Sequence, residues 1–303
     1  MAVDLMIASN NSTDAVKEFF SSITNGVIKL SKGSLIEWQK KTSKMLEPQI
    51  KNIQQNLMES YYTNADESQI KVSGQAYNVL GVSNKKYTRI WASKNKSQKA
   101  IEEIGFLNHY QGIVVKDGTD LYNKCGRKKA QCLSHILRYI KGISDFNHHS
   151  GAIEMSKLLS EINRKRNKYI EEGKEEFNEK ERKEFNREFN NIFKKWKKEW
   201  MQSSEENNPV YEDERKLLSR FEDKKERAEI LFFIKDFKIP STNNQIETDL
   251  RPIKIKQKIG KFRSEKGAEL YAEIRSCINT YKKQNYSPFS MLEKMFNGEL
   301  QIV

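Results

Sequence analysis

Cysteine, long apolar runs and an N-terminal leader pattern are what this 303-residue chain has least of. Its three cysteines, Cys125, Cys132 and Cys277, are too few for a disulfide framework, so the sequence favours a reducing compartment such as the cytoplasm. No apolar run approaches the roughly 20 residues of a membrane helix. No basic stretch followed by an apolar one marks a secretion signal. The hydrophobic fraction of 37% is low, but it suffices for a core in part of the chain.

Positive charge is in excess. Lysine and arginine total 54 against 41 aspartate and glutamate residues, which gives a formal net charge of +13. A strongly basic soluble protein most often meets an anionic partner, and nucleic acid is the commonest one. The alternative is a structural or regulatory helical protein whose positive charge serves only solubility. Salt-dependent DNA binding distinguishes the two.

The first 55 residues are predicted to be helical. Apolar residues recur at helical spacing in residues 14–23, Gly26 interrupts the pattern, and Ser31 is placed to cap a second helix. Helix, short turn and helix is the outline of a helix-turn-helix, and a plain helical hairpin fits equally well.

Strand patterns begin after residue 60. Three β-prone runs with short connections predict an antiparallel meander, and the first of them ends at the acid pair Asp66-Glu67. The three runs are residues 61–66, 70–82 and 86–92.

A fourth strand is predicted further along. A helix over residues 97–104 precedes the apolar run 113–115, which is soon followed by Asp117. A continuous apolar run that ends in an acid is typical of a buried strand that delivers a side chain at its carboxyl end. Residues 130–133 are a candidate fifth strand, and a helix is predicted over 135–143.

Strand signals disappear between residues 146 and 228, where Glu, Lys, Arg and Asn dominate. We predict an inserted helical hairpin there, with Asn207-Asn208-Pro209 as the turn between its long helices. A direct DNA clamp is the alternative. The pair His148-His149 is predicted to lie solvated in a polar turn. Aromatic residues at spacings of 8, 4, 4 and 3 fit one buried helical stripe: Phe177, Phe185, Phe189, Phe193 and Trp196.

Residues 243–264 combine one central carboxylate, Glu247, with a dense run of cations. The pair Asn243-Asn244 suits a helix start, because an Asn side chain accepts from the first free N–H groups, and this puts Glu247 in the first turn. An ionised carboxylate is a hard oxygen ligand for Mg2+, and the cations suit phosphate. A mixed-charge surface helix is the plainer interpretation. The candidate DNA contacts are Arg251, Lys254, Lys256, Lys258, Lys261 and Arg263.

Three blocks of sequence resemble the transposases of the insertion sequence 66 family, over residues 26–297. The resemblance implies an RNase H-like catalytic core, a mixed α/β sheet that carries DDE chemistry, with a large helical insertion. The first block is Asp66-Glu67-Ser68 with Val72-Ser73-Gly74. The second is 112–117 with Tyr122, followed by the Cys132, His135 and Arg138 signature. The third is 243–247 with Leu250-Arg251-Pro252, Lys254, Lys258, Gly260, Phe262-Arg263-Ser264 and Gly267-Ala268.

The resemblance also implies the site. Asp66, Asp117 and Glu247 match the catalytic triad that holds two Mg2+ or Mn2+ ions, cuts a phosphodiester at the element's end and joins the freed 3′-hydroxyl to target DNA. Zinc is not expected, because Cys132 and His135 supply only half of a structural site. Additional support for the active site is expected from His135, Arg138, Asn243 and Asn244.

The chain departs from the family pattern in two ways. Family members usually carry Arg where this chain has Thr248, and they usually have a further N-terminal region with zinc-binding and DNA-binding segments. A truncated, catalytically inactive DNA-binding remnant is therefore the alternative function. We expect a helical domain over 1–55, an RNase H-like core over 56–145 and 229–303, and a helical insertion over 146–228. The resemblance implies a homo-oligomer on element ends and target DNA, in the bacterial cytoplasm at the nucleoid and without a membrane.

Overall fold

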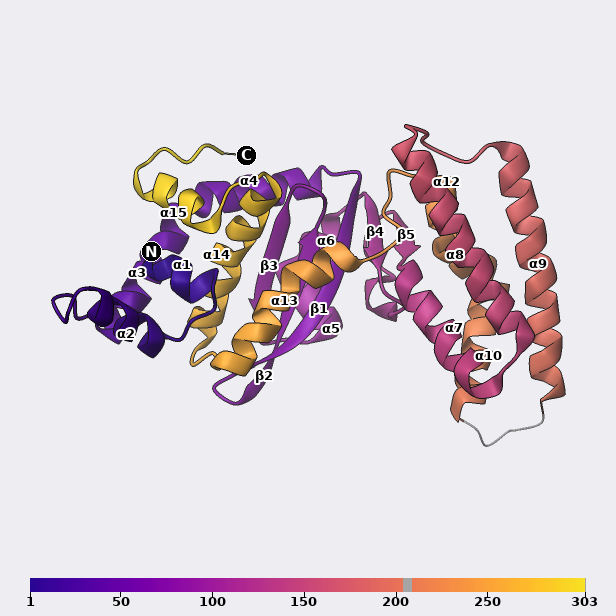
Figure 1. The fold of residues 1–303 in the computed structure, drawn as a ribbon, viewed down its shortest axis with the longest axis horizontal. Coiled ribbons are helices and arrows are strands. Elements are labelled where there is room, and N and C mark those ends of the chain that lie inside the picture. The colour runs from indigo at the N-terminus through magenta and orange to yellow at the C-terminus, as the bar shows by residue number, and fades with distance from the viewer. Residues whose placement is uncertain (204–208, 303) are drawn as a thin grey trace. The chain divides into compact units, whose positions relative to one another are not determined.

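The computed structural model describes residues 1–203 and 209–302 (Figure 1). Its architecture is mixed α/β, as predicted, with a five-stranded sheet of strand order β3-β2-β1-β4-β5. The chain forms two compact units, which we describe separately. The meander unit comprises Met1–Gly112, Asn123–Arg127 and Asn244–Val303, and the helical unit comprises Ile113–Tyr122 and Lys128–Asn243.

Three antiparallel strands form the centre of the meander unit: β1 (Tyr62–Val72), β2 (Gln75–Ser83) and β3 (Thr88–Ser93). The predicted meander is confirmed, but the predicted end of its first strand is wrong. Ser73 and Gly74 both have positive φ (48° and 84°), the requirement of a two-residue hairpin turn, so pairing continues past the acid pair as far as Val72. Asp66 therefore lies in the middle of β1, opposite Gly81, and does not close the strand.

Helices surround the meander. Ser31 caps its helix as predicted, since its side chain accepts from the N–H of Ser34, and Ser264 caps another by accepting from Gly267. The helices are α1 (Ala2–Ile7), α2 (Thr13–Ile23), α3 (Lys32–Met45), α4 (Glu47–Met58), α5 (Ser97–Ile104), α6 (Phe106–His109), α13 (Asn244–Ile259), α14 (Glu265–Lys283) and α15 (Pro288–Phe296).

The buried helix α14 closes the outer edge of the meander. The N–H groups of Thr88 and Ile90 in β3 donate to the hydroxyls of Thr280 (3.0 Å) and Ser276 (2.9 Å). Edge-strand N–H groups that lack a neighbouring strand are thus satisfied by a helix, which removes a site for unwanted strand pairing.

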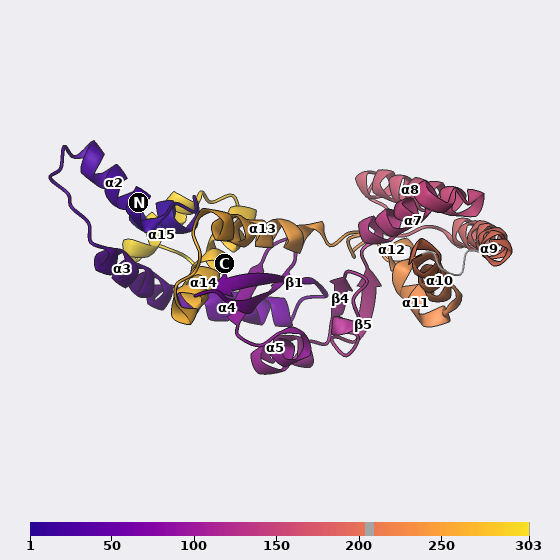
Figure 2. The same ribbon diagram turned by 90° about the horizontal axis from the view of Figure 1, so that it is seen from below.

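The helical unit holds a short parallel pair, β4 (Ile113–Lys116) and β5 (Lys128–Gln131), with the 3-10 turn η1 (Asp120–Tyr122) between them. Helices α7 to α10 contact one another in sequence and lie side by side in both views (Figures 1 and 2). The helices are α7 (Leu133–Asn147), α8 (Ser150–Glu171), α9 (Glu179–Gln202), α10 (Pro209–Glu222), α11 (Lys224–Ile230) and α12 (Phe232–Lys235).

The aromatic stripe predicted for this region is buried except for the half-buried Phe185, and its position in α9 needs one correction. Phe177 precedes α9, because Asn178 ends the preceding loop with a capping box to Glu181. The Phe177 ring still joins the core edge-on to Phe185 (5.0 Å between centroids) and Phe237 (4.9 Å). The predicted turn at Asn207-Asn208 lies outside the described residues.

The prediction that His149 is solvated is wrong. Its Nδ1 lies 2.7 Å from Oε1 of Glu214, a fully buried carboxylate on α10. The same carboxylate accepts from Nδ2 of Asn147 (2.6 Å) and from Nε1 of Trp196. The end of α7 and the polar turn after it are thus fixed, because a buried acid needs donors and each supplies one.

Candidate active site

Asp66 lies on the face of the meander that α13 covers. A Cβ placed on Gly81, the partner of Asp66 across the strands, would lie 2.7 Å from Cδ1 of Ile246 and 3.0 Å from Cδ2 of Leu250. Residues directly opposite on antiparallel strands project from the same face of a sheet. The Asp66 side chain therefore projects toward the side on which α13 packs.

Glu247 occupies the first turn of α13, as predicted, because the helix begins at Asn244. Helix α13 packs on β1 and β2 (Figure 1). Ile246 and Leu250 anchor it there, and Gly81 allows their close approach. The meander unit thus places Asp66 and the helix turn that carries Glu247 on one face of the sheet.

A buried ion pair fixes the orientation of α13. Oδ2 of Asp249 accepts from Nζ of Lys283 and from Oγ1 of Thr88, each at 2.8 Å. Burial lowers the pKa of Lys283, and Asp249 partly offsets that shift. Because Asp249 lies two residues after Glu247, this pair couples α14 and β3 to the first turns of α13.

Asp117 directly follows β4, as predicted. Its Oδ1 accepts from the N–H of Thr119 at 3.0 Å, and Nζ of the buried Lys116 donates to the carbonyl of Thr119 at 2.7 Å. Burial lowers the pKa of Lys116 despite the attraction of Glu229 and other nearby acids. Both contacts fix the conformation of the loop that follows β4.

Cys132 directly follows β5, at the edge of the sheet where Asp117 follows β4. Strands β4 and β5 are parallel and Lys116 is in register with Gln131, so Asp117 and Cys132 both leave at the carboxyl ends of their strands. The N–H of Cys132 donates to the carbonyl of Lys116 (2.8 Å), and that of Asn243 donates to its Sγ (3.1 Å).

Of the four predicted support residues, His135 and Asn243 contact this thiol. Burial raises the pKa of Cys132, but hydrogen bonds from His135, Ser134 and the N–H of Asn243 outweigh that effect and lower it. Asn243 is buried, whereas Asn244 is exposed. Arg138 is exposed on α7, along a shallow groove shared with α8, and does not join this cluster.

Arg220 is a neighbour of Asp117 that the sequence did not indicate. A Cβ placed on Gly118 would lie 3.2 Å from both Nη1 and Nη2 of Arg220, and Nη2 also donates to Oε1 of Gln131. Its Nε donates to Glu226 at 3.1 Å. The guanidinium, on α10, thus lies against the ends of β4 and β5. About 100 residues separate it from Asp117, and no motif marks it.

A family model described as "Transposase IS66 family" matches residues 19–270. The chain belongs to this family. No curated protein matches the chain. The family resemblance expected from the sequence is confirmed, and the match includes Asp66, Asp117 and Glu247. A transposase acts on DNA, so DNA is the partner and DNA cleavage the general activity that membership implies.

The six cations proposed as DNA contacts of this transposase differ in exposure and position. Arg251, Lys254 and Lys258 are exposed at spacings of three and four along α13, which places them on one side of the helix. Lys256 is half-buried, and its Nζ donates to the carbonyl of Asn11 at 3.2 Å. Lys261 and Arg263 are exposed in the linker to α14.

Across residues 1–203 and 209–302, no helix combines the length and apolarity that a bilayer span requires.

Proposed function

We propose that this transposase cuts and joins DNA phosphodiesters by two-metal-ion catalysis, with Asp66, Asp117 and Glu247 as metal ligands. Three carboxylates are the oxygen donors that Mg2+ or Mn2+ prefers, so the residues fit the ions. Bound Mg2+ would activate a water for in-line attack and stabilise the leaving 3′ oxygen. The residues themselves would fix the positions of the ions relative to the scissile phosphate.

The observation that supports the proposal best is the pairing of Asp66 with Gly81 beneath Ile246 and Leu250. It supports assigning an acid in mid-strand, Asp66, and an acid far along the chain, Glu247, to one site. The chain path adds support, because Asn243 is hydrogen-bonded at the strand ends beside Asp117 and directly precedes α13. The strand order β3-β2-β1-β4-β5, antiparallel then parallel, is compatible with the RNase H-like assignment.

Single substitutions test the assignment. Asp66→Asn, Asp117→Asn and Glu247→Gln should each lower Mg2+-dependent cleavage and strand transfer by at least about a hundredfold, since losing even an outer-shell partner of a metal site costs about 10–100-fold. DNA binding without metal should persist in all three variants.

Glu67→Gln is the matched control. Glu67 neighbours Asp66 but projects from the opposite face, where it accepts from Nδ2 of Asn78 at 3.1 Å. It should retain cleavage within a few-fold of wild type. Full activity in any of the three carboxylate variants would refute the triad. Wild-type protein that binds DNA but never cleaves it would instead identify an inactive DNA-binding member of the family.

We also propose that the protein acts as a homo-oligomer on paired element ends, as the family resemblance implies. Light scattering with and without DNA tests this: a mass that stays at 35.5 kDa per DNA end would contradict it.

A further inference from the structure

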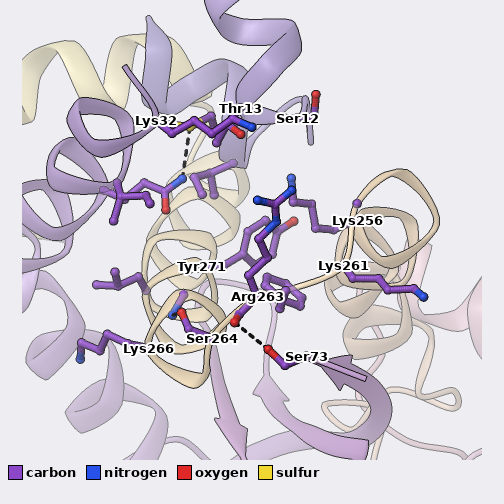
Figure 3. A pocket seen from close by; sticks show the side chains of 18 of the residues that line it. Ser12, Thr13, Lys32, Ser73, Lys256, Lys261, Arg263, Ser264, Lys266 and Tyr271 are labelled. Carbon is purple, nitrogen blue, oxygen red and sulfur yellow. Dashed lines mark hydrogen bonds between the residues drawn. The ribbon is translucent and has the colours of Figure 1, made fainter. Parts of the chain in front are cut away.

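The meander unit contains a cavity of about 670 Å³ that none of the proposed catalytic residues lines (Figure 3). Helices α1 to α3, the end of α13, the start of α14 and the turn between β1 and β2 surround it. Segments from both ends of the sequence therefore build one pocket, which no local motif could indicate.

The pocket is strongly cationic. One acid, Asp14, lines it against six basic side chains: Lys32, Lys40, Lys256, Lys261, Arg263 and Lys266. Three of these cations already have carboxylate partners, because Lys32 pairs with Asp14 (2.9 Å), Lys40 with Glu37 (3.2 Å) and Lys266 with Glu269 (3.1 Å).

The other three are available to a ligand. Within the described ranges, Lys256, Lys261 and Arg263 have no carboxylate within 4.0 Å. Lys256 is half-buried and donates only to a backbone carbonyl, so burial lowers its pKa with no acid to offset the shift. A partly buried cation without a counter-ion is stabilised when an anion binds beside it.

The linker that carries two of these cations is held in place. The N–H of Ser73 donates to the carbonyl of Phe262 (2.9 Å), and its hydroxyl donates to that of Arg263 (2.7 Å). Ser264 then caps α14, whose first N–H groups add a positive end to the same wall (Figure 3). A fixed backbone limits the entropy lost when these side chains bind a ligand.

We propose that this pocket binds a phosphodiester of a DNA backbone, held by Lys256, Lys261 and Arg263, as a positioning contact outside the catalytic site. The proposal rests on the DNA-directed function proposed above. A polymer fits better than a single anion, because the same helix carries the exposed cations Arg251, Lys254 and Lys258 beyond the pocket.

The test is metal-free DNA binding by the full chain, measured by anisotropy of a labelled duplex over a salt series. Lys261→Gln/Arg263→Gln should weaken binding at least about tenfold at low salt and reduce the slope of log K against log salt by about 2, since each phosphate contact contributes about 0.9. Lys51→Gln/Lys99→Gln removes two exposed lysines from α4 and α5 of the same unit and should change affinity less than about twofold.

The outcomes separate this inference from the proposed chemistry. The Asp66→Asn variant should bind DNA with the affinity of wild type. Equal affinities of the two double variants, or no DNA binding by wild type, would overturn the inference. If the wild-type protein does not cleave DNA but the two double variants still differ in DNA affinity, only the two-metal proposal is refuted.

Discussion

Among the described residues, each unit has one buried carboxylate, and the two units satisfy it differently. In the meander unit, Asp249 pairs with the cation Lys283 and the hydroxyl of Thr88. In the helical unit, Glu214 accepts hydrogen bonds from Asn147, His149 and Trp196. Among the described residues, no lysine or arginine lies within 4.0 Å of its carboxylate. The first arrangement joins helix to sheet, whereas the second joins helices to one another.

The difference shows what each unit contributes. Asp249 lies on the helix that carries Glu247, so its ion pair bears directly on the proposed site. Glu214 lies more than a turn of α10 before Arg220, whose guanidinium lies against the strand ends beside Asp117. The packing of the helical unit therefore determines where the Arg220 guanidinium lies next to Asp117, a proposed metal ligand.

The largest effect is expected from Asp249→Ala. It leaves the Lys283 ammonium buried without its partner, which should lower the free energy of unfolding by about 3–5 kcal/mol. Urea unfolding measures the loss, and cleavage should fall with it because α13 loses an anchor. The double variant Asp249→Asn/Lys283→Met leaves no orphaned charge and should recover part of the stability. A single variant as stable as wild type would mean that the pair does not hold α13.

A smaller loss is expected from Glu214→Gln. The new amide turns an N–H₂ toward at least one of the three donors around this buried position, which should cost about 1–3 kcal/mol. Thermal unfolding followed by circular dichroism measures the loss. Lys195→Ala removes only an exposed ion pair with Glu154 and should give a superimposable curve. Equal curves for Glu214→Gln and Lys195→Ala would contradict the importance of the buried network.

The smallest effect is expected at Arg220, the cation beside Asp117 in the helical unit. Arg220→Gln should lower cleavage roughly tenfold, or about 1.4 kcal/mol in the barrier, because the loop after β4 loses the guanidinium that packs on it. Arg215→Gln, on the same helix but exposed and paired with Glu212, is the control and should cleave like wild type. If both variants cleave equally, Arg220 serves only the packing of α10.

Much of the fold could be predicted because local patterns and tertiary packing agree. The cap at Ser31, the helix that begins at Asn244 and the acid after β4 are all local features, and the structure confirms each one. The error at Asp66 arose where the local signal was ambiguous. Polar residues after the acid pair indicated a strand end, whereas pairing with β2 supports the strand as far as Val72.

The long-range features could not be predicted in the same way. His149 follows a polar turn that would be solvated in isolation, and only the buried Glu214 draws it inward. Lys256 belongs by sequence to one basic run, yet α13 turns it toward a pocket and away from Arg251 and Lys254.

By itself, the sequence determined the family, the excess of positive charge and the types of most elements, and it suggested the three acids proposed as metal ligands, because each of these depends on residue type and near-neighbour spacing. Only the tertiary structure decided that Gly81 admits α13 over Asp66, that Arg220 lies against Gly118, and that six cations from distant segments line one cavity. These are contacts between residues far apart along the chain, and their geometry depends on how whole elements pack.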